Sequence, residues 1–241
     1  MTGADEIADL ADGLRGASDM AELERRFAAA IGRYGFNASA CGAFVTTRLG
    51  PAPVFFFQNW PRDWMERYMA EGFVEHDFGV AEARATVEPF TWSEAFARRR
   101  LSAGERRVWQ AALDYGWADG FSVPIHGPGG YFGLVAMAGV RPLEDRAARH
   151  ALATLSRTAH ERARKLAGPL ADEAEPLAEP LTARELACLR WVAAGLEDPA
   201  IGRELGVSRN TVKDHLTNAR RKLKADTRAQ AVARALVNGL M

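Results

Sequence analysis

The hydrophobic pattern of the first two thirds of the chain predicts helices around a set of short strands. Apolar residues three or four positions apart predict a helical region over 4–35, and the same spacing returns further along. These further predicted helices are 61–71, 78–84, 103–115 and 145–166. Short β-branched or aromatic runs bounded by Gly and Pro predict strands. The predicted strands are 38–47, 53–58, 89–92, 121–126 and 131–139.

Helices beside about five short strands indicate an α+β fold, in which an antiparallel sheet is covered on both faces as an α/β/α sandwich. Residues 127–130 read Gly-Pro-Gly-Gly between the last two strands and predict a hairpin turn. A phosphate-binding loop is the alternative. No lysine is near and no helix start follows, so the hairpin is favoured.

The last third of the chain predicts four helices. Thr182 and Glu185 form a capping box that begins the first helix. The other three are predicted at 199–205, 207–223 and 226–239. Ahead of them, 168–180 holds three prolines and four acidic residues without periodicity, as expected of a linker. The expected organisation is a domain over 1–167, a linker over 168–180 and an all-α domain over 181–241.

The helix predicted at 207–223 is amphipathic. Ser208 is a good N-cap, and Gly206 supplies the turn from the short helix before it. The apolar stripe consists of Val212, Leu216, Ala219 and Leu223. Two helices joined by a tight turn, the second basic and amphipathic, are typical of a helix-turn-helix whose second helix enters the major groove of DNA.

The polar face of this helix supplies the candidate DNA contacts. The residues expected to face base edges are Asn210, Lys213, Asp214 and Thr217. Those expected to contact phosphates are Ser208, Arg209, Arg220, Arg221 and Lys222, and Thr211 completes the candidate set. A solvated helix face with no partner is the alternative. The capping box, the turn and the final helix all lie at suitable distances, which favours DNA binding.

Charge is uneven along the chain, although the net charge of the 241 residues is zero. Residues 176–241 hold 11 basic and 7 acidic residues, whereas the other 175 residues hold 20 and 24. This asymmetry fits a nucleic-acid-binding module attached to an acidic domain. The acidic N-terminus and the lack of an apolar run of about 18 residues predict no signal peptide and no membrane span. A cytoplasmic protein is therefore expected.

Cysteine and histidine usage points away from disulfides and metals. Cys41 and Cys188 fall in different predicted domains, and the five histidines show no metal-ligand spacing. No cofactor is expected.

Aromatic and acidic residues in the N-terminal part form a candidate ligand site. Trp64 and Tyr68 lie four apart on one predicted helix, Asp77 follows, and Trp92 ends the strand at 89–92. Indole and phenol donors with a carboxylate can line an apolar pocket that holds a small amide or ester. Each residue also has a plainer interpretation, because the aromatics can be core residues and Asp77 can cap the helix after it.

The C-terminal segment 181–240 resembles the helix-turn-helix of LuxR-type transcription regulators. The residues that carry the resemblance are Glu185, Leu189, Gly195, Ile201, Leu205, Ser208, Thr211, Val212, His215, Lys222, Leu223 and Ala231. Receiver-type response regulators share this module, so the resemblance alone does not name the signal.

The N-terminal pattern resembles the autoinducer-binding domain of LuxR-type quorum-sensing receptors. Trp64 and Tyr68 are followed by Asp77, Trp92 and Gly120 at the spacing of that family. The resemblance implies a site for an N-acyl-homoserine lactone. Trp64 would donate to the lactone carbonyl, Asp77 would accept from the amide, Tyr68 would flank the acyl chain and Trp92 would pack beside the lactone. Gly120 is expected to be a backbone requirement.

Three residues depart from the family pattern. Phe78 stands where the family usually has proline, and Trp60 stands where a tyrosine that donates to the acyl carbonyl is common. Ala136 falls where many members carry serine or threonine. The predicted ligand-binding set is Trp60, Trp64, Tyr68, Asp77, Trp92 and Ala136. Two hydroxyls near the acyl group are thus missing, and the expected acyl group is short, branched or aromatic.

Together the resemblances imply a ligand-responsive regulator that binds palindromic promoter DNA and is not an enzyme. Expected partners are double-stranded DNA, RNA polymerase and a second copy of the chain, because palindromic sites call for a homodimer. The helices at 145–166 and 226–239 have apolar stripes that either form the dimer or pack within their own domains.

Three other functions are less favoured. A receptor for another small molecule remains an alternative. A response regulator requires a catalytic lysine, but the one lysine before the linker, Lys165, comes too late in the chain. A lactone hydrolase is disfavoured because neither a Gly-x-Ser-x-Gly motif nor a His-rich metal motif is present.

Overall fold

The computed structural model describes residues 3–47, 50–98, 100–168, 179–237 and 240–241. The chain divides into two compact units, one formed by residues 1–126 with 131–172 and the other by 127–130 with 173–241. Most of the predicted linker, 169–178, lies outside the described residues. No helix in the described ranges is long and apolar enough to cross a membrane.

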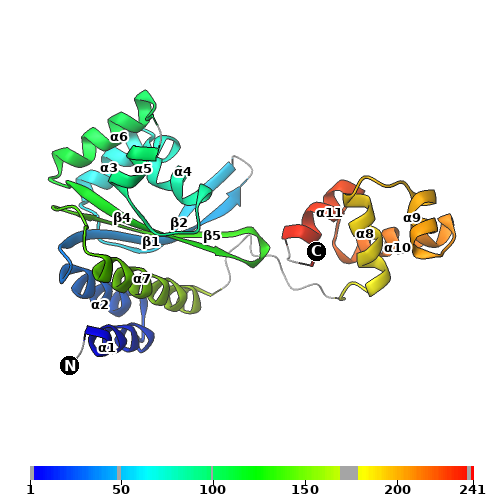
Figure 1. Ribbon diagram of the computed structural model, residues 1–241, viewed down its shortest axis with the longest axis horizontal. Coiled ribbons are helices and arrows are strands. Elements are labelled where there is room, and N and C mark those ends of the chain that lie inside the picture. Colours follow the sequence, from blue (N-terminus) through cyan, green and yellow to red (C-terminus); the bar gives the residue numbers. More distant parts are fainter. Residues whose placement is uncertain (1–2, 48–49, 99, 169–178, 238–239) are drawn as a thin grey trace. The chain divides into compact units, whose positions relative to one another are not determined.

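The N-terminal unit is built on one sheet of five strands in the order β2-β1-β5-β4-β3 (Figure 1). The strands are β1 (Phe36–Thr47), β2 (Gly50–Gln58), β3 (Phe90–Thr91), β4 (Asp119–Gly127) and β5 (Tyr131–Gly139). β1 pairs antiparallel with β2 and β5, and β3 pairs antiparallel with β4. The predicted five-stranded antiparallel sheet is confirmed. Residues 128–130 form a short 3-10 turn between β4 and β5.

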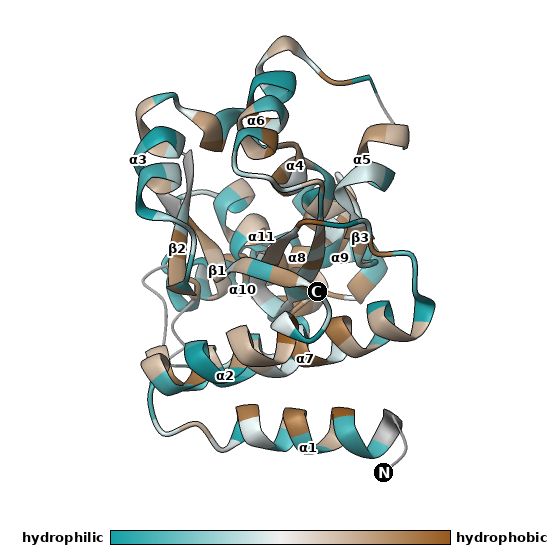
Figure 2. Cartoon of the chain, turned by 90° about the vertical axis from the view of Figure 1, so that its left-hand side faces the viewer, coloured by the Kyte–Doolittle hydropathy of each residue, from teal (hydrophilic) through white to brown (hydrophobic). Residues whose placement is uncertain are grey.

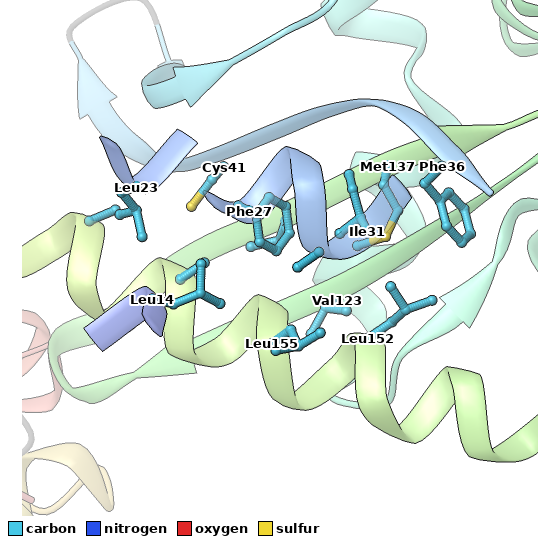
Figure 3. Close-up of a cluster of buried hydrophobic side chains, with 14 of the residues drawn as sticks. Leu14, Leu23, Phe27, Ile31, Phe36, Cys41, Val123, Met137, Leu152 and Leu155 are labelled. Carbon is cyan, nitrogen blue, oxygen red and sulfur yellow. The ribbon is translucent and has the colours of Figure 1, made fainter. Parts of the chain in front are cut away.

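One face of the sheet packs on α1 (Gly3–Arg15), α2 (Met20–Gly32) and α7 (Arg146–Ala167). Figure 3 shows Phe27 and Ile31 of α2 and Leu152 and Leu155 of α7 gathered in this core. The region predicted as helical over 4–35 is in fact two helices. The second helix, α2, begins after Asp19, because the Asp19 side chain accepts the N–H of Glu22 and caps the helix start.

The helix α7 is covered within its own unit. Its apolar stripe contacts the sheet and the two N-terminal helices, and Figure 2 shows the brown residues of α1 on the side toward α2 and α7. The exposed positions of α7 are mostly polar, such as Arg146, His150 and Arg157. Of the two interpretations of the 145–166 stripe, packing within the domain is therefore the one the structure shows.

The other face of the sheet carries α3 (Arg62–Ala70), a 3-10 turn (Phe73–His76), α4 (Phe78–Ala85), α5 (Trp92–Arg98) and α6 (Ala103–Asp114). The helix α5 was not predicted. Trp92 begins it, whereas the pattern placed Trp92 at the end of a strand. The missed signal is a capping box. The N–H of Thr91 donates to Glu94 Oε2 over 2.9 Å, and the N–H of Glu94 donates to Thr91 Oγ1 over 3.2 Å.

The C-terminal unit consists of α8 (Ala183–Ala193), α9 (Asp198–Leu205), α10 (Arg209–Lys222) and α11 (Arg228–Val237). The predicted four-helix helix-turn-helix domain is confirmed. Thr182 and Glu185 form the predicted capping box of α8. Gly206 adopts φ 65°, a left-handed conformation that ends α9 and makes the turn into α10. Val212 and Leu216 of α10 lie in the small core of this unit.

Candidate ligand pocket and DNA-binding helix

One cavity lies between the sheet and the helices α3, α4, α5 and α6. Its volume is about 100 Å³, several times the space that one buried water needs. All six predicted ligand-binding residues line it: Trp60, Trp64, Tyr68, Asp77, Trp92 and Ala136. The structure therefore brings together side chains that are spread over 77 positions of the sequence.

Small residues of the central strands leave room for this cavity. Ala40 and Gly42 on β1 and Ala136 on β5 line its sheet side. The pairing of β1 with β2 shifts register between Cys41 and Gly42. A Cβ on Gly42 would lie 2.4 Å from the carbonyl oxygen of Val54, so only glycine fits this irregular pairing. The aromatic side chains of the helices form the opposite wall.

Asp77 has both of the roles that its sequence position allowed. Its Oδ1 accepts the N–H groups of Gly79 (2.8 Å) and Val80 (3.1 Å) and so caps α4. Its Oδ2 accepts the hydroxyl of Tyr68 over 2.7 Å. An ionised carboxylate can accept about four hydrogen bonds, so the Asp77 side chain retains acceptor capacity toward the cavity.

The ionisation of Asp77 and Tyr68 reflects their burial. Burial raises the pKa of Asp77, while the hydrogen bonds from Tyr68, Val80 and Gly79 oppose that rise. The pKa of Tyr68 is also raised, by burial and by the adjacent carboxylate. Tyr68 is thus a fixed hydroxyl donor, and it orients the carboxylate that faces the cavity.

Trp92 lies flat against Gly120. A Cβ on Gly120 would fall 2.2 Å from the indole ring, so glycine is required here by close packing against Trp92 and not, as expected, by its backbone conformation. The indole N–H of Trp92 donates to the hydroxyl oxygen of Ser122 over 3.3 Å, and that buried hydroxyl also lines the cavity. Ser122 is a site residue that was not predicted from the sequence. Its position two residues after Gly120 on one strand, and therefore on the same face, was the available signal.

Trp117 is a second residue that sequence analysis missed. It is almost fully buried, and its ring packs edge-on against Trp60 and Trp64 with centroids 4.9 and 5.0 Å apart. These contacts hold two cavity-lining rings in place. The indole N–H groups of Trp60 and Trp64 find no acceptor in the described part of the chain, so both can donate to a ligand.

Phe78, which departs from the family pattern, is part of an aromatic cluster on this wall. Its ring lies 4.5 Å from that of Phe96 and 5.9 Å from that of Trp92, measured between centroids. Trp109 of α6 contacts the rings of Phe96 and Trp92 from behind. The departure therefore adds apolar surface beside Trp92.

The second candidate site is the outward face of α10. The exposed predicted residues on this helix are Arg209, Asn210, Lys213, Asp214, Thr217 and Arg221. Ser208 caps the helix by accepting the N–H of Thr211 over 3.1 Å, and the two hydroxyls are 2.8 Å apart. The first turn of α10 thus presents backbone N–H groups and polar side chains together, as binding of a phosphate requires.

The basic residues at the end of α10 are less free than the sequence suggested. Lys222 was predicted to contact phosphate, but its Nζ binds Glu185 Oε2 over 2.8 Å and its side chain is largely buried, so that prediction is corrected to a structural role. Arg220 is half-buried and donates to the carbonyl of Asp226. Arg221 is exposed and pairs with Glu179 through both nitrogens. A phosphate contact by Arg221 would require breaking that pair.

Ion pairs join the four helices of this unit. Burial alone would raise the pKa of Glu185, but the hydrogen bonds from Lys222 and Thr182 lower it overall. The guanidinium of Arg228 binds both oxygens of Asp198 and lowers the pKa of that carboxyl. Among the described residues, no group of three or more His, Cys, Asp or Glu is placed to hold a metal ion.

A sheet with an apolar cavity on one face, followed by a helix-turn-helix, is the arrangement of a ligand-responsive DNA-binding regulator. Residues 19–163 match the autoinducer binding domain family, and 179–235 match the luxR family of bacterial regulatory proteins. The chain belongs to the LuxR-type quorum-sensing transcription regulators.

Individual relatives agree with this assignment. The chain is 35% identical over 220 residues to the HTH-type quorum sensing-dependent transcriptional regulator RpaR of Rhodopseudomonas palustris, covering 91% of this chain and 88% of RpaR. It is 30% identical over 234 residues to the transcriptional activator protein BjaR1 of Bradyrhizobium diazoefficiens, covering 96% and 94%. A structure of SdiA, a protein of Escherichia coli, in complex with octanoyl-rac-glycerol shares the fold with a TM-score of 0.69 at 19% identity, covering 100% and 97%.

Proposed function

We propose that the N-terminal unit binds an N-acyl-homoserine lactone and that this binding sets the affinity of α10 for palindromic promoter DNA. The observation that carries the proposal is the cavity itself, where the buried Asp77 carboxylate and the unpaired indole N–H of Trp64 line one apolar space. An acyl-homoserine lactone has an amide N–H that can donate to the Asp77 carboxylate and a lactone carbonyl that can accept from the Trp64 indole N–H.

Each wall residue has a role in this proposal. Trp64 donates to the lactone carbonyl, Asp77 accepts the amide N–H, and Tyr68 flanks the start of the acyl chain while holding the carboxylate. Trp92 packs beside the lactone ring. Hydrogen bonds to a buried charged group typically contribute about 1.5–3 kcal/mol, so the amide contact is expected to be the strongest single polar term.

The acyl group is proposed to be short, branched or aromatic. Trp60 is a bulky ring on the cavity wall, fixed by Trp117, and it leaves less length than a smaller side chain would. Ala136 places a methyl group where a hydroxyl would help to hold the acyl carbonyl. A flat or compact group fits between these rings and the small residues of the sheet.

Calorimetric titration with a panel of lactones tests the proposal. The panel contains N-butanoyl-, N-isobutanoyl-, N-benzoyl- and N-dodecanoyl-homoserine lactone. Tightest binding to a short, branched or aromatic member is expected. Tightest binding to the dodecanoyl member contradicts the acyl assignment, and no binding by any member contradicts the lactone assignment.

A different small-molecule signal is the second candidate, and SdiA in complex with octanoyl-rac-glycerol is the observation that favours it. A glycerol ester has no amide N–H to offer Asp77. Titration with octanoyl-rac-glycerol therefore separates the two ligands. Recovery of intact lactone after incubation with the protein excludes the less favoured hydrolase, since turnover would consume the lactone.

On DNA, the proposed unit of function is a homodimer that acts with RNA polymerase. A palindrome repeats one half-site, so each copy of α10 reads one half. The apolar residues on the outer side of α11, which include the exposed Leu236, support a role for this helix in the dimer. A mobility shift on a palindrome-containing promoter, with and without lactone, tests both the DNA site and the response.

A further inference from the structure

The carboxylate of Asp119 holds the start of α5 onto β4. This side chain is 2% exposed. Its Oδ1 accepts the N–H of Ser93 over 3.1 Å and the N–H of Gly120 over 2.8 Å. Its Oδ2 accepts the hydroxyl of Ser93 over 2.7 Å. One buried side chain therefore joins the residue that follows Trp92 to the residue that lies beneath the Trp92 ring.

The contact between Trp92 and Gly120 is close, so the indole ring can move little relative to β4. The space that a Cβ on Gly120 would occupy is already filled by the indole, at 2.2 Å. If α5 shifted along β4, the ring would either lose this contact or collide with the strand. The position of Trp92, and with it one wall of the cavity, depends on how firmly α5 is tied to β4.

A second anchor reaches α5 from the helix on the other face of the sheet. Arg149 of α7 binds both oxygens of Glu94, over 2.7 and 2.9 Å. Glu94 also closes the capping box of α5 with Thr91. The first turn of α5 is thus bound on one side by Asp119 and on the other by Arg149.

Burying the carboxylate of Asp119 costs free energy, so stability alone does not explain an aspartate at this position. Among the described residues the carboxylate makes no salt bridge, and the one cation that interacts with it electrostatically, Arg149, is hydrogen-bonded to Glu94 instead, so the desolvation of Asp119 is offset mainly by its hydrogen bonds. All three of its hydrogen bonds go to the two residues that place Trp92. We propose that Asp119 is a positioning residue of the ligand site, which fixes Trp92 against Gly120 and so shapes the wall beside the lactone.

The inference rests on the proposed function for its ligand, but it can be tested without one. Protein labelled with 5-fluorotryptophan gives one ¹⁹F resonance for each of the six tryptophans, and Trp92→Phe identifies that of Trp92. We expect Asp119→Ala to shift and broaden the Trp92 resonance. The resonance of Trp191, in the C-terminal unit, should stay in place as an internal reference.

The conservative variant Asp119→Asn separates positioning from charge. Its amide oxygen can still accept the N–H groups of Ser93 and Gly120, and its NH₂ can donate to the Ser93 hydroxyl. The Trp92 resonance of this variant should stay close to that of the parent protein. Should Asp119→Ala fail to fold, Ser93→Ala removes only the hydroxyl bond and should move the Trp92 resonance in the same direction by less.

Affinity for the tightest-binding lactone of the panel gives the second measurement. Asp119→Ala should weaken it about tenfold, as expected when contacts in a binding site lose their alignment. In a Trp92→Phe background, the same change should alter affinity by less than about twofold, because a double-mutant cycle isolates the effect that passes through Trp92. Asp19→Ala, which removes the cap of α2 on the other face of the sheet, is the control for general destabilisation.

A failure of the positioning role and a failure of the proposed lactone ligand give different results. An unmoved Trp92 resonance in both Asp119→Ala and Ser93→Ala overturns the positioning role, whether or not a lactone binds. An equal loss of affinity with and without Trp92 also overturns it. If no lactone binds the parent protein while the Trp92 resonance shifts as expected, the proposed ligand is wrong and the positioning of Trp92 by Asp119 stands.

Discussion

At the scale of single residues, several positions in this chain are restricted by two demands at once. Asp77 must cap α4 through one oxygen and hold Tyr68 through the other, while the same carboxylate lines the cavity. Gly120 has no side chain because Trp92 occupies that space. Substitutions at such positions change both the local backbone and the ligand site, so a variant has to be chosen to separate the two effects.

Asp77→Asn separates the effect on the helix cap from the effect on ligand binding. The amide oxygen of asparagine can still cap α4, and asparagine is a good N-cap. The negative charge is lost, and with it the proposed charge-assisted hydrogen bond to the ligand amide, worth about 1.5–3 kcal/mol. Titration calorimetry should therefore show lactone affinity reduced by more than about tenfold. Unchanged affinity would show that Asp77 is only a helix cap.

His160 makes the stability of the N-terminal unit depend on pH. It is 2% exposed, and burial lowers its pKa from 6.5 to about 4. Below pH 6.5 the unfolded chain takes up a proton that the folded state refuses until about pH 4. The stabilisation present above pH 6.5 is therefore lost as pH falls through this window, by at most about 1.4 kcal/mol per pH unit.

Urea unfolding at several pH values between 7.5 and 4.5 measures this slope. His160→Gln should flatten it, because glutamine does not titrate. His150→Gln is the matched control, since His150 lies on the same helix but is exposed, and its slope should equal that of the parent protein. Equal slopes in all three proteins would exclude His160 as the cause.

At the scale of elements, local capping decides where helices begin. The Thr-x-x-Glu pattern at 182–185 predicts a helix start, and α8 begins there. The same pattern at 91–94 begins α5, yet the β-type run before it favoured a strand. A helix of seven residues has too few apolar positions to show a period, so the capping box was the only sequence signal for α5.

The prediction at the scale of elements concerns the exposed face of α10. Lys213→Ala should impair the mobility shift on palindromic DNA and leave lactone affinity unchanged, because the exposed side chain lies in the first half of the helix that we propose enters the groove. Losing one base contact is worth about 1–3 kcal/mol of discrimination. Lys165→Ala, an exposed lysine of α7, is the control that should not affect DNA binding. An intact mobility shift for Lys213→Ala would place the base-reading strip elsewhere on the helix.

At the scale of the whole molecule, a compact unit with an apolar cavity is joined to a compact helical unit in one chain. A ligand that binds the folded cavity stabilises that unit by mass action. A ligand also changes DNA affinity only as far as the two sites are coupled, and the coupling is reciprocal. The proposed function therefore predicts a measurable quantity, the ratio of the DNA affinities with and without lactone.

Hydrogen exchange along the chain measures how far ligand stabilisation extends. At a lactone concentration about 100 times the dissociation constant, stabilisation of about 2.7 kcal/mol is expected for amides that exchange by opening of the cavity. Protection should rise in β1, β4, β5 and α3, which surround the cavity. Asp77→Asn at the same concentration should show a smaller gain. Protection unchanged around the cavity would contradict binding at this place.

Much of the fold and of the site follows from the sequence, because the relevant signals are local. Helical periodicity, capping boxes and glycine turns act within about ten residues, and they predicted most helices, the hairpin and the helix-turn-helix. The break between α1 and α2 and the helix α5 were missed. In both places a cap acts over three residues, whereas the longer apolar pattern around it indicated one continuous helical region over 4–35 and a strand at 89–92.

The sequence by itself indicated six of the residues that line the cavity, through their spacing and their resemblance to the autoinducer-binding domain, and it indicated which face of α10 is polar. Only the tertiary structure decided what those residues are tied to. Lys222 binds Glu185 from 37 positions away, Trp117 fixes Trp60, and Asp119 joins Ser93 to Gly120. Such pairings arise when the helices pack on the sheet and bury polar groups that must find partners, and no local pattern in the chain encodes which partners those will be.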